Sequence, residues 1–151
     1  MLMVSVVSAE SQDKTMELLD KYQDMRLSCE AGINKVDYER EYRDLYVATM
    51  KSEENIDKET YSKFHKILNY YDDAKTIWTI SYDLCTQEDF DKLNNKYPNI
   101  SKEVYHDIFG GYGKIDVANY IVKIANTEEK QLEKFLKERT VEQQKQEKTA
   151  E

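Results

Sequence analysis

Histidine and carboxylate side chains are the groups in this chain most able to do chemistry, and their spacing argues against catalysis. A zinc-type site would need both histidines, His65 and His106, together with a carboxylate, yet no ligand-spacing motif joins them. Adjacent acidic residues such as Asp72 and Asp73 diverge by about 100° on a helix, so they do not form an acid–base pair. We therefore predict that the protein is not an enzyme and holds no cofactor and no metal ion.

A glycine-rich stretch, FGGYGK at residues 109–114, invites comparison with phosphate-binding loops. It lacks the GxxxxGK[ST] spacing, a preceding strand and a hydroxyl residue after Lys114. We interpret it as a turn that lets the last helix fold back. Tyr112, which lies between glycines, is a candidate contact for a protein partner.

The two cysteines, Cys29 and Cys85, lie near the ends of the first and third predicted helices. If three consecutive helices run up, down and up, both thiols lie at one end of the bundle, where they can form a disulfide. This bridge would close a loop of about 57 residues and stabilise the fold by about 4 kcal/mol. The alternative is two unrelated buried thiols. Neither cysteine has a CxxC partner, so a catalytic thiol is not indicated.

Tyrosine is unusually frequent, with twelve copies against four phenylalanines and one tryptophan. Tyr38, Tyr42 and Tyr46 recur at every fourth position of a predicted helix, and their amphipathic rings suit protein recognition at the rim of a bundle. We predict these three, with Tyr112, as candidate partner contacts. The alternative is that they pack in the core with only their hydroxyl groups at the rim.

Composition limits the remaining choices. A chain of 151 residues forms one domain with a core of its own. The 22 basic and 30 acidic residues give a net charge of −8, which disfavours nucleic-acid binding. With four glycines and one proline the composition favours helices over turn-rich sheets. No apolar run approaches the roughly 20 residues that a membrane span requires.

Apolar residues spaced by three and four predict an all-α fold, a single helical bundle of about five helices over residues 10–137. Asn34 and Asp57 are expected to cap the second and third helices, and Gly32 to end the first. Two neighbouring apolar stripes over residues 57–85 predict a long, central third helix. A short helix should end before Pro98. Residues 138–151 are nearly devoid of apolar side chains and are expected to be a charged, disordered tail.

Residues 1–9, MLMVSVVSA, have two interpretations. The sequence Val7-Ser8-Ala9 has the small residues of an export-signal cleavage site, although the apolar run is short and no basic residue precedes it. The segment is then the remnant of an export signal. The alternative is a structural segment of a cytoplasmic protein, as a strand or a first helical turn.

These observations predict a small exported protein, periplasmic or secreted, that acts by contact with an unidentified protein partner. We expect no nucleic-acid partner and no membrane span. The alternative is an intracellular acidic helical inhibitor of phage or plasmid type, in which carboxylates mimic a nucleic acid and occupy a basic groove on another protein.

Overall fold

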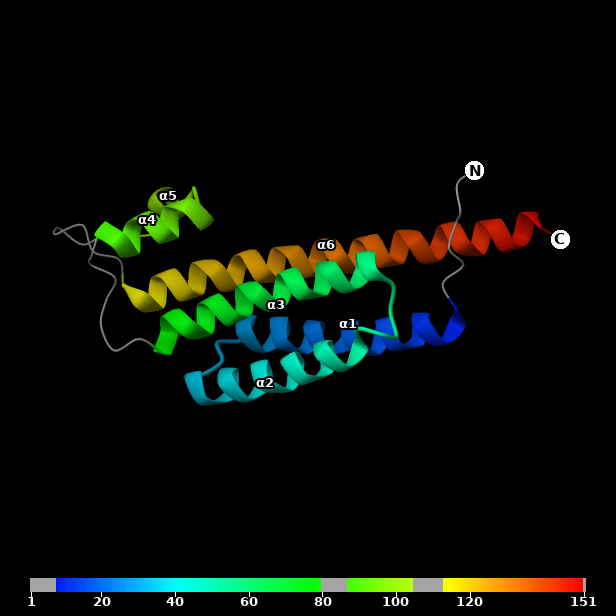
Figure 1. Ribbon diagram of the computed structural model, residues 1–151, viewed down its shortest axis with the longest axis horizontal. Coiled ribbons are helices and arrows are strands. Elements are labelled where there is room, and N and C mark those ends of the chain that lie inside the picture. Colours follow the sequence, from blue (N-terminus) through cyan, green and yellow to red (C-terminus); the bar gives the residue numbers. More distant parts are fainter. Residues whose placement is uncertain (1–7, 80–86, 105–112, 151) are drawn as a thin grey trace.

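A computed structural model describes residues 8–79, 87–104 and 113–150 of the chain (Figure 1). These residues form helices and no strands, which confirms the predicted all-α class. The helices are α1 (Ala9–Glu30), α2 (Lys35–Ser52), α3 (Lys58–Thr79), α4 (Gln87–Lys96), α5 (Ile100–Glu103) and α6 (Lys114–Thr149). Because α5 is a single turn of four residues, the described part contains five longer helices, as expected.

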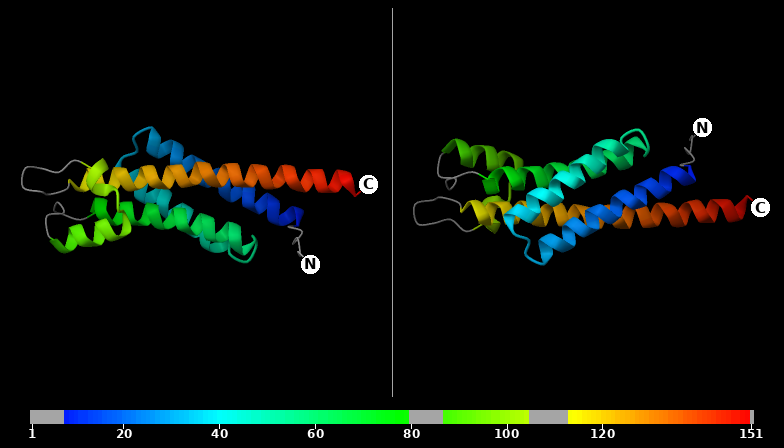
Figure 2. Two further views of the ribbon diagram at one scale, coloured as in Figure 1. Left: turned by 90° about the horizontal axis from the view of Figure 1, so that it is seen from above. Right: turned by 90° about the horizontal axis from the view of Figure 1, so that it is seen from below.

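Helices α1, α2, α3 and α6 form a four-helix bundle of alternating direction (Figures 1 and 2). Each packs on two neighbours, since α1 contacts α2 and α6, and α3 contacts α2 and α6. Short connections favour this arrangement because they force consecutive helices to be antiparallel. Helices α1 and α3 therefore run in the same direction, and their C-terminal ends lie at the same end of the bundle (Figure 1).

The helix starts follow the capping residues in the sequence. The Asn34 side chain accepts a hydrogen bond from the backbone N–H of Asp37 at 2.9 Å, and that of Asp57 accepts one from Thr60 at 3.0 Å. Both predicted caps are confirmed. Gly32 follows α1 with φ of 88°, a left-handed conformation that glycine adopts without strain.

The core contains tyrosines whose hydroxyl groups are satisfied inside the bundle. The Tyr22 hydroxyl lies 2.8 Å from the Thr49 hydroxyl and donates to the Phe64 carbonyl at 3.0 Å. The Tyr71 hydroxyl donates to the Asn126 side chain at 2.8 Å. Because partners inside the fold replace water, these rings can be wholly buried, and their polar ends need not reach the rim.

The third helix differs from the expectation in its position. Over its described residues α3 is as long as α1, at 22 residues, whereas α6 is the longest at 36 residues. The two apolar stripes of α3 do contact two neighbours, α2 and α6, but each of the four bundle helices has two neighbours. The core therefore lies between the four helices, and α3 is not its axis. Residues 80–85 of the predicted third helix lie outside the described residues.

Helix α6 continues to Thr149, through most of the segment expected to be a disordered tail. Its charged residues pair along the helix, as in the 2.6 Å contact of Lys137 with Glu133. They also reach other helices, because Arg139 binds the Asp57 carboxylate at 3.0 Å and Gln143 contacts Gln12. Polar contacts thus hold a helix end that apolar periodicity does not reveal.

Helices α4 and α5 pack beside the N-terminal part of α6, on the side away from α1 and α2 (Figure 1). Tyr97, just after α4, is buried between the rings of Tyr70 and Tyr120, with centroid distances of 6.2 and 6.4 Å. Helix α4 ends at Lys96, before Pro98, as predicted. In the described residues, no helix has the length and apolarity that crossing a membrane requires.

Candidate functional site

The tyrosines predicted as partner contacts divide into buried and exposed ones. Tyr38 is only 1% exposed, and its hydroxyl donates to the Tyr71 carbonyl at 2.7 Å while its ring packs on Trp78. It cannot touch a partner while the bundle is intact, so it is corrected to a core residue. Tyr42 is 8% exposed, whereas Tyr46 is 46% exposed. Tyr112 lies outside the described residues.

A groove of about 520 Å³ lies between α2 and α3, beside Tyr42 and Tyr46. The two rings are neighbours, with centroids 6.3 Å apart. The Lys75 ammonium group lies 4.3 Å from the centre of the Tyr42 ring and 3.3 Å from the Asp72 carboxylate. Arg43 and Glu39 also line the side of the groove formed by α2. The groove thus joins aromatic rings with both signs of charge.

Aromatic and sulfur-containing side chains extend this surface toward the other end of α2. The Tyr61 hydroxyl points at the Met50 sulfur at 3.8 Å, and the Tyr61 ring packs on His65 at 5.9 Å. Burial raises the pKa of Tyr61, and the charge of Glu53 adds to the effect. We call this surface the α2–α3 face. Its members are Tyr42, Arg43, Tyr46, Met50, Tyr61 and Lys75.

The outward side of α2 carries two exposed cationic residues between two exposed apolar ones. Val36, Arg40, Arg43 and Val47 follow one another at spacings of four, three and four, so they lie on one side of the helix. Val36 is 72% exposed, an unusual exposure for a branched apolar side chain. Arg40 pairs with Asp37 at 2.8 Å, whereas Arg43 makes no ion pair with any described residue. We call these four residues the α2 ridge.

Electrostatics keeps Tyr42 neutral. Burial raises its pKa, and the neighbouring Asp72 carboxylate raises it further, because both disfavour a phenolate. The ring therefore offers an uncharged face to a cation, and Lys75 occupies it within the molecule. This arrangement can recognise a partner by contact, and it provides no group poised for proton transfer.

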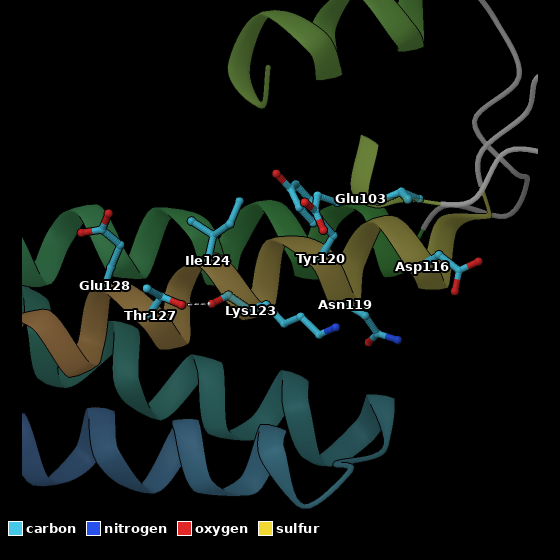
Figure 3. Close-up of a pocket in the computed structure, with 9 residues that line it drawn as sticks. Glu103, Asp116, Asn119, Tyr120, Lys123, Ile124, Thr127 and Glu128 are labelled. Atoms are coloured by element: carbon cyan, nitrogen blue, oxygen red, sulfur yellow. Dashed lines mark hydrogen bonds between the residues drawn. The ribbon is translucent and has the colours of Figure 1, made fainter. Parts of the chain in front are cut away.

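A second groove, of about 580 Å³, lies between α5 and the start of α6 (Figure 3). Glu103, Asp116 and Glu128 contribute carboxylates to it, and Lys123 an ammonium group. Asp116 and Glu128 stand at opposite ends of the groove, about 18 Å apart along α6 at 1.5 Å per residue (Figure 3). Its polar groups do not converge, so this groove is a poor site for a small ligand.

Cys29 is half-buried near the end of α1. Burial, together with the charges of Glu41 and Glu30, raises the pKa of its thiol to about 12, so the thiol is unreactive at neutral pH. The parallel course of α1 and α3 is the geometry from which the disulfide was predicted. Cys85 lies outside the described residues, and the Cys29–Cys85 pairing stays a prediction.

Metal ligands are not gathered in the described part of the chain. No group of three His, Cys, Asp or Glu side chains there could hold a metal ion. His65 is partly buried between Tyr61 and Asn69, whose amide nitrogen lies 3.3 Å from the histidine Nδ1. His106 lies outside the described residues.

A buried ion pair between α1 and α6 escaped the sequence analysis. The Glu129 side chain is 0% exposed and binds Arg26, which is 14% exposed, through one carboxylate oxygen. Its other oxygen, Oε1, is buried without a hydrogen-bond partner among the described residues. Burial raises the pKa of Glu129 despite the arginine. The sequence did contain a signal for this burial, because Glu129 lies on the same side of the helix as the apolar residues Ala125, Leu132 and Leu136.

The exposed side of α1 carries a row of carboxylates that was also missed. Asp13, Glu17, Asp20 and Asp24 are exposed and lie on one side of the helix, over about 16 Å. None of them forms an ion pair with a described residue. The same spacing of three and four that reveals apolar faces would have revealed this acidic one.

Comparisons of the chain with protein-family models, with curated proteins and with solved structures found no match. What defines the protein is therefore its fold, an all-α four-helix bundle with a short helical addition, and the geometry of its surfaces.

Proposed function

We propose that this protein acts by contact with another protein and that the α2–α3 face is its binding surface, without catalysis. The observation that carries the proposal is a groove lined by Tyr42, Tyr46 and the unpaired Arg43, with Tyr61 near Tyr46. Tyrosine and arginine, with tryptophan, are the residues most enriched at the energetic centres of protein interfaces. Rigid rings also lose little conformational entropy on binding.

Site-specific photo-crosslinking tests this surface. A photoreactive amino acid replaces Tyr46 on the α2–α3 face, or Lys123, which is also exposed, on α6 as a control. In cells that make the protein naturally, position 46 should give a discrete crosslinked product with one protein, and position 123 should not. Equal yields at the two positions, or no product at position 46, would reject the α2–α3 face as the binding surface.

The proposal includes export to the periplasm or the exterior and a Cys29–Cys85 disulfide. The common direction of α1 and α3 supports the pairing, because it brings their C-terminal ends to one end of the bundle (Figure 1). Mass spectrometry of the protein alkylated under denaturing conditions, with and without reductant, tests the bridge. Blocked cysteines that become alkylated only after reduction are expected. Two thiols alkylated without reductant would refute the bridge and weaken the case for export.

A second candidate is the acidic inhibitor that mimics a nucleic acid inside the cell. The exposed carboxylate row of Asp13, Glu17, Asp20 and Asp24 favours it, because regularly spaced negative charges can fill a basic groove. Crosslinking from position 20 distinguishes the two candidates. Capture of a DNA- or RNA-binding protein at position 20, and of none at position 46, would favour the mimic.

A further inference from the structure

We propose that the segment bound by the α2–α3 face is an amphipathic helix of the partner that carries carboxylates, lying along the α2 ridge. This inference rests on the proposed function and adds the chemistry of the partner. The ridge residues are spaced by four, three and four, and Met50 extends the series by three. This is the spacing of a helix seam that packs against another helix.

The dimensions of the ridge fit a short helix. From Val36 to Met50 the seam extends about 21 Å, which corresponds to roughly four turns of a partner helix. The groove between α2 and α3 lies beside the ridge and is lined by the Tyr42 and Tyr46 rings. An apolar side chain of the partner can enter the groove between ridge contacts, in the manner of helix-in-groove recognition.

The charges on the ridge determine the sign of the charge that the partner segment should carry. Arg40 and Arg43 lie within the seam, where Asp37 already pairs with Arg40. The Glu39 and Asp44 carboxylates lie on the flanks of the seam. Arg43 has no ion-pair partner among the described residues, so its guanidinium group can bind a carboxylate without breaking an existing pair. The Lys75 ammonium group already contacts Asp72 and Tyr42, so it contributes less than Arg43 to binding a partner carboxylate.

Two other occupants fit the ridge less well. A single-stranded nucleic acid could stack on Tyr46 and pair with Arg43, but the net charge of −8 and the carboxylate row of α1 oppose it. A second copy could offer its own α1 row, whose acidic residues have the same spacing. However, two copies would each carry the same excess of negative charge.

Binding of defined probes to the whole protein tests the partner's chemistry. The first probe is a fluorescent helical peptide of about four turns with leucine and glutamate alternating along its seam. The second has lysine in place of each glutamate, and the third is a single-stranded oligonucleotide of similar length. Fluorescence anisotropy measures each affinity at low and at physiological salt, and sedimentation measures the oligomeric state.

The acidic peptide should bind, and the basic peptide and the oligonucleotide should bind at least tenfold more weakly. Arg43→Glu should weaken the binding of the acidic peptide by about tenfold or more at low salt, because like charges at an interface repel. Lys123→Glu changes the net charge equally at an exposed position on α6 and should have little effect. Equal binding of the two peptides, tighter binding of the oligonucleotide, or self-association broken by Arg43→Glu would overturn the inference.

The outcomes also separate this inference from the proposed function. If position 46 crosslinks a protein whose captured segment is neutral or basic, the α2–α3 face remains the binding surface and the acidic-helix inference fails. If position 46 captures no protein, the proposed function fails.

Discussion

Removing Arg26 should destabilise the protein strongly, because it leaves the buried Glu129 carboxylate without its partner. The Glu129 side chain has no exposed surface, and its Oε1 already lacks a hydrogen bond within the described structure. Breaking a buried ion pair by removing one partner costs roughly 3–5 kcal/mol. Arg26 is 14% exposed, so water can partly replace it, and we expect the lower end, about 3 kcal/mol.

Thermal and urea denaturation followed by circular dichroism measure this cost. For a domain of this size, about 3 kcal/mol corresponds to a decrease in Tm of roughly 6–12 °C in Arg26→Met. The double variant Arg26→Met with Glu129→Leu removes both charges and keeps apolar volume, so its stability should return close to that of the wild type. The reasoning is refuted if Arg26→Met is as stable as the wild type, or if the double variant is no more stable than Arg26→Met.

Three further predictions concern a buried acid, a cap and the tyrosines. Since burial raises the pKa of Glu129, the folded state binds its proton more tightly, and stability falls as pH rises from the ordinary carboxyl value of about 4.3 through the raised value. The stability of Glu129→Gln relative to the wild type, from urea titrations across this range, should therefore increase with pH, and a decrease would contradict the direction of the shift. Asn34→Ala should lower the free energy of unfolding by about 1 kcal/mol, because the Asp37 N–H in the first turn of α2 loses its hydrogen bond to the Asn34 side chain. An unchanged urea midpoint would show that this cap is not stabilising. Tyr38→Phe should lower the free energy of unfolding by about 1 kcal/mol and leave partner binding unchanged. Tyr46→Ala should weaken partner binding and leave the free energy of unfolding nearly unchanged. The reverse pattern would return Tyr38 to the binding surface.

Local signals in the sequence predicted the fold well. Asn34 and Asp57 cap the helices that they were expected to cap, and Pro98 follows the end of α4, because these effects depend on neighbouring backbone groups. The alternating direction of the first three helices follows from short connections in the same way.

Contacts between distant residues explain what the sequence analysis missed. The end of α6 is held partly by Arg139 binding Asp57, a contact across two helices that apolar periodicity cannot reveal. Tyr38 and Tyr71 are buried because each hydroxyl finds a partner on another helix. A tyrosine with such a partner has the same sequence signature as one at a rim.

The candidate site was predicted only in part. Spacing by four placed Tyr38, Tyr42 and Tyr46 on one side of a helix, but it could not distinguish the exposed Tyr46 from the buried Tyr38. The groove also needs Asp72 and Lys75 from α3, and pairing between helices is not encoded in either segment alone. The α2 ridge could have been recognised from the spacing of four, three and four between its valines and arginines.

The central claim is that the α2–α3 face binds a protein partner. Its most direct test is the Kd of the partner crosslinked at position 46, measured by calorimetry for the wild type and for Tyr46→Ala. An exposed tyrosine at the centre of an interface contributes about 2 kcal/mol, so the variant should bind roughly 30-fold more weakly. An unchanged Kd for Tyr46→Ala, with a large loss for Asp20→Lys on α1, would contradict the claim.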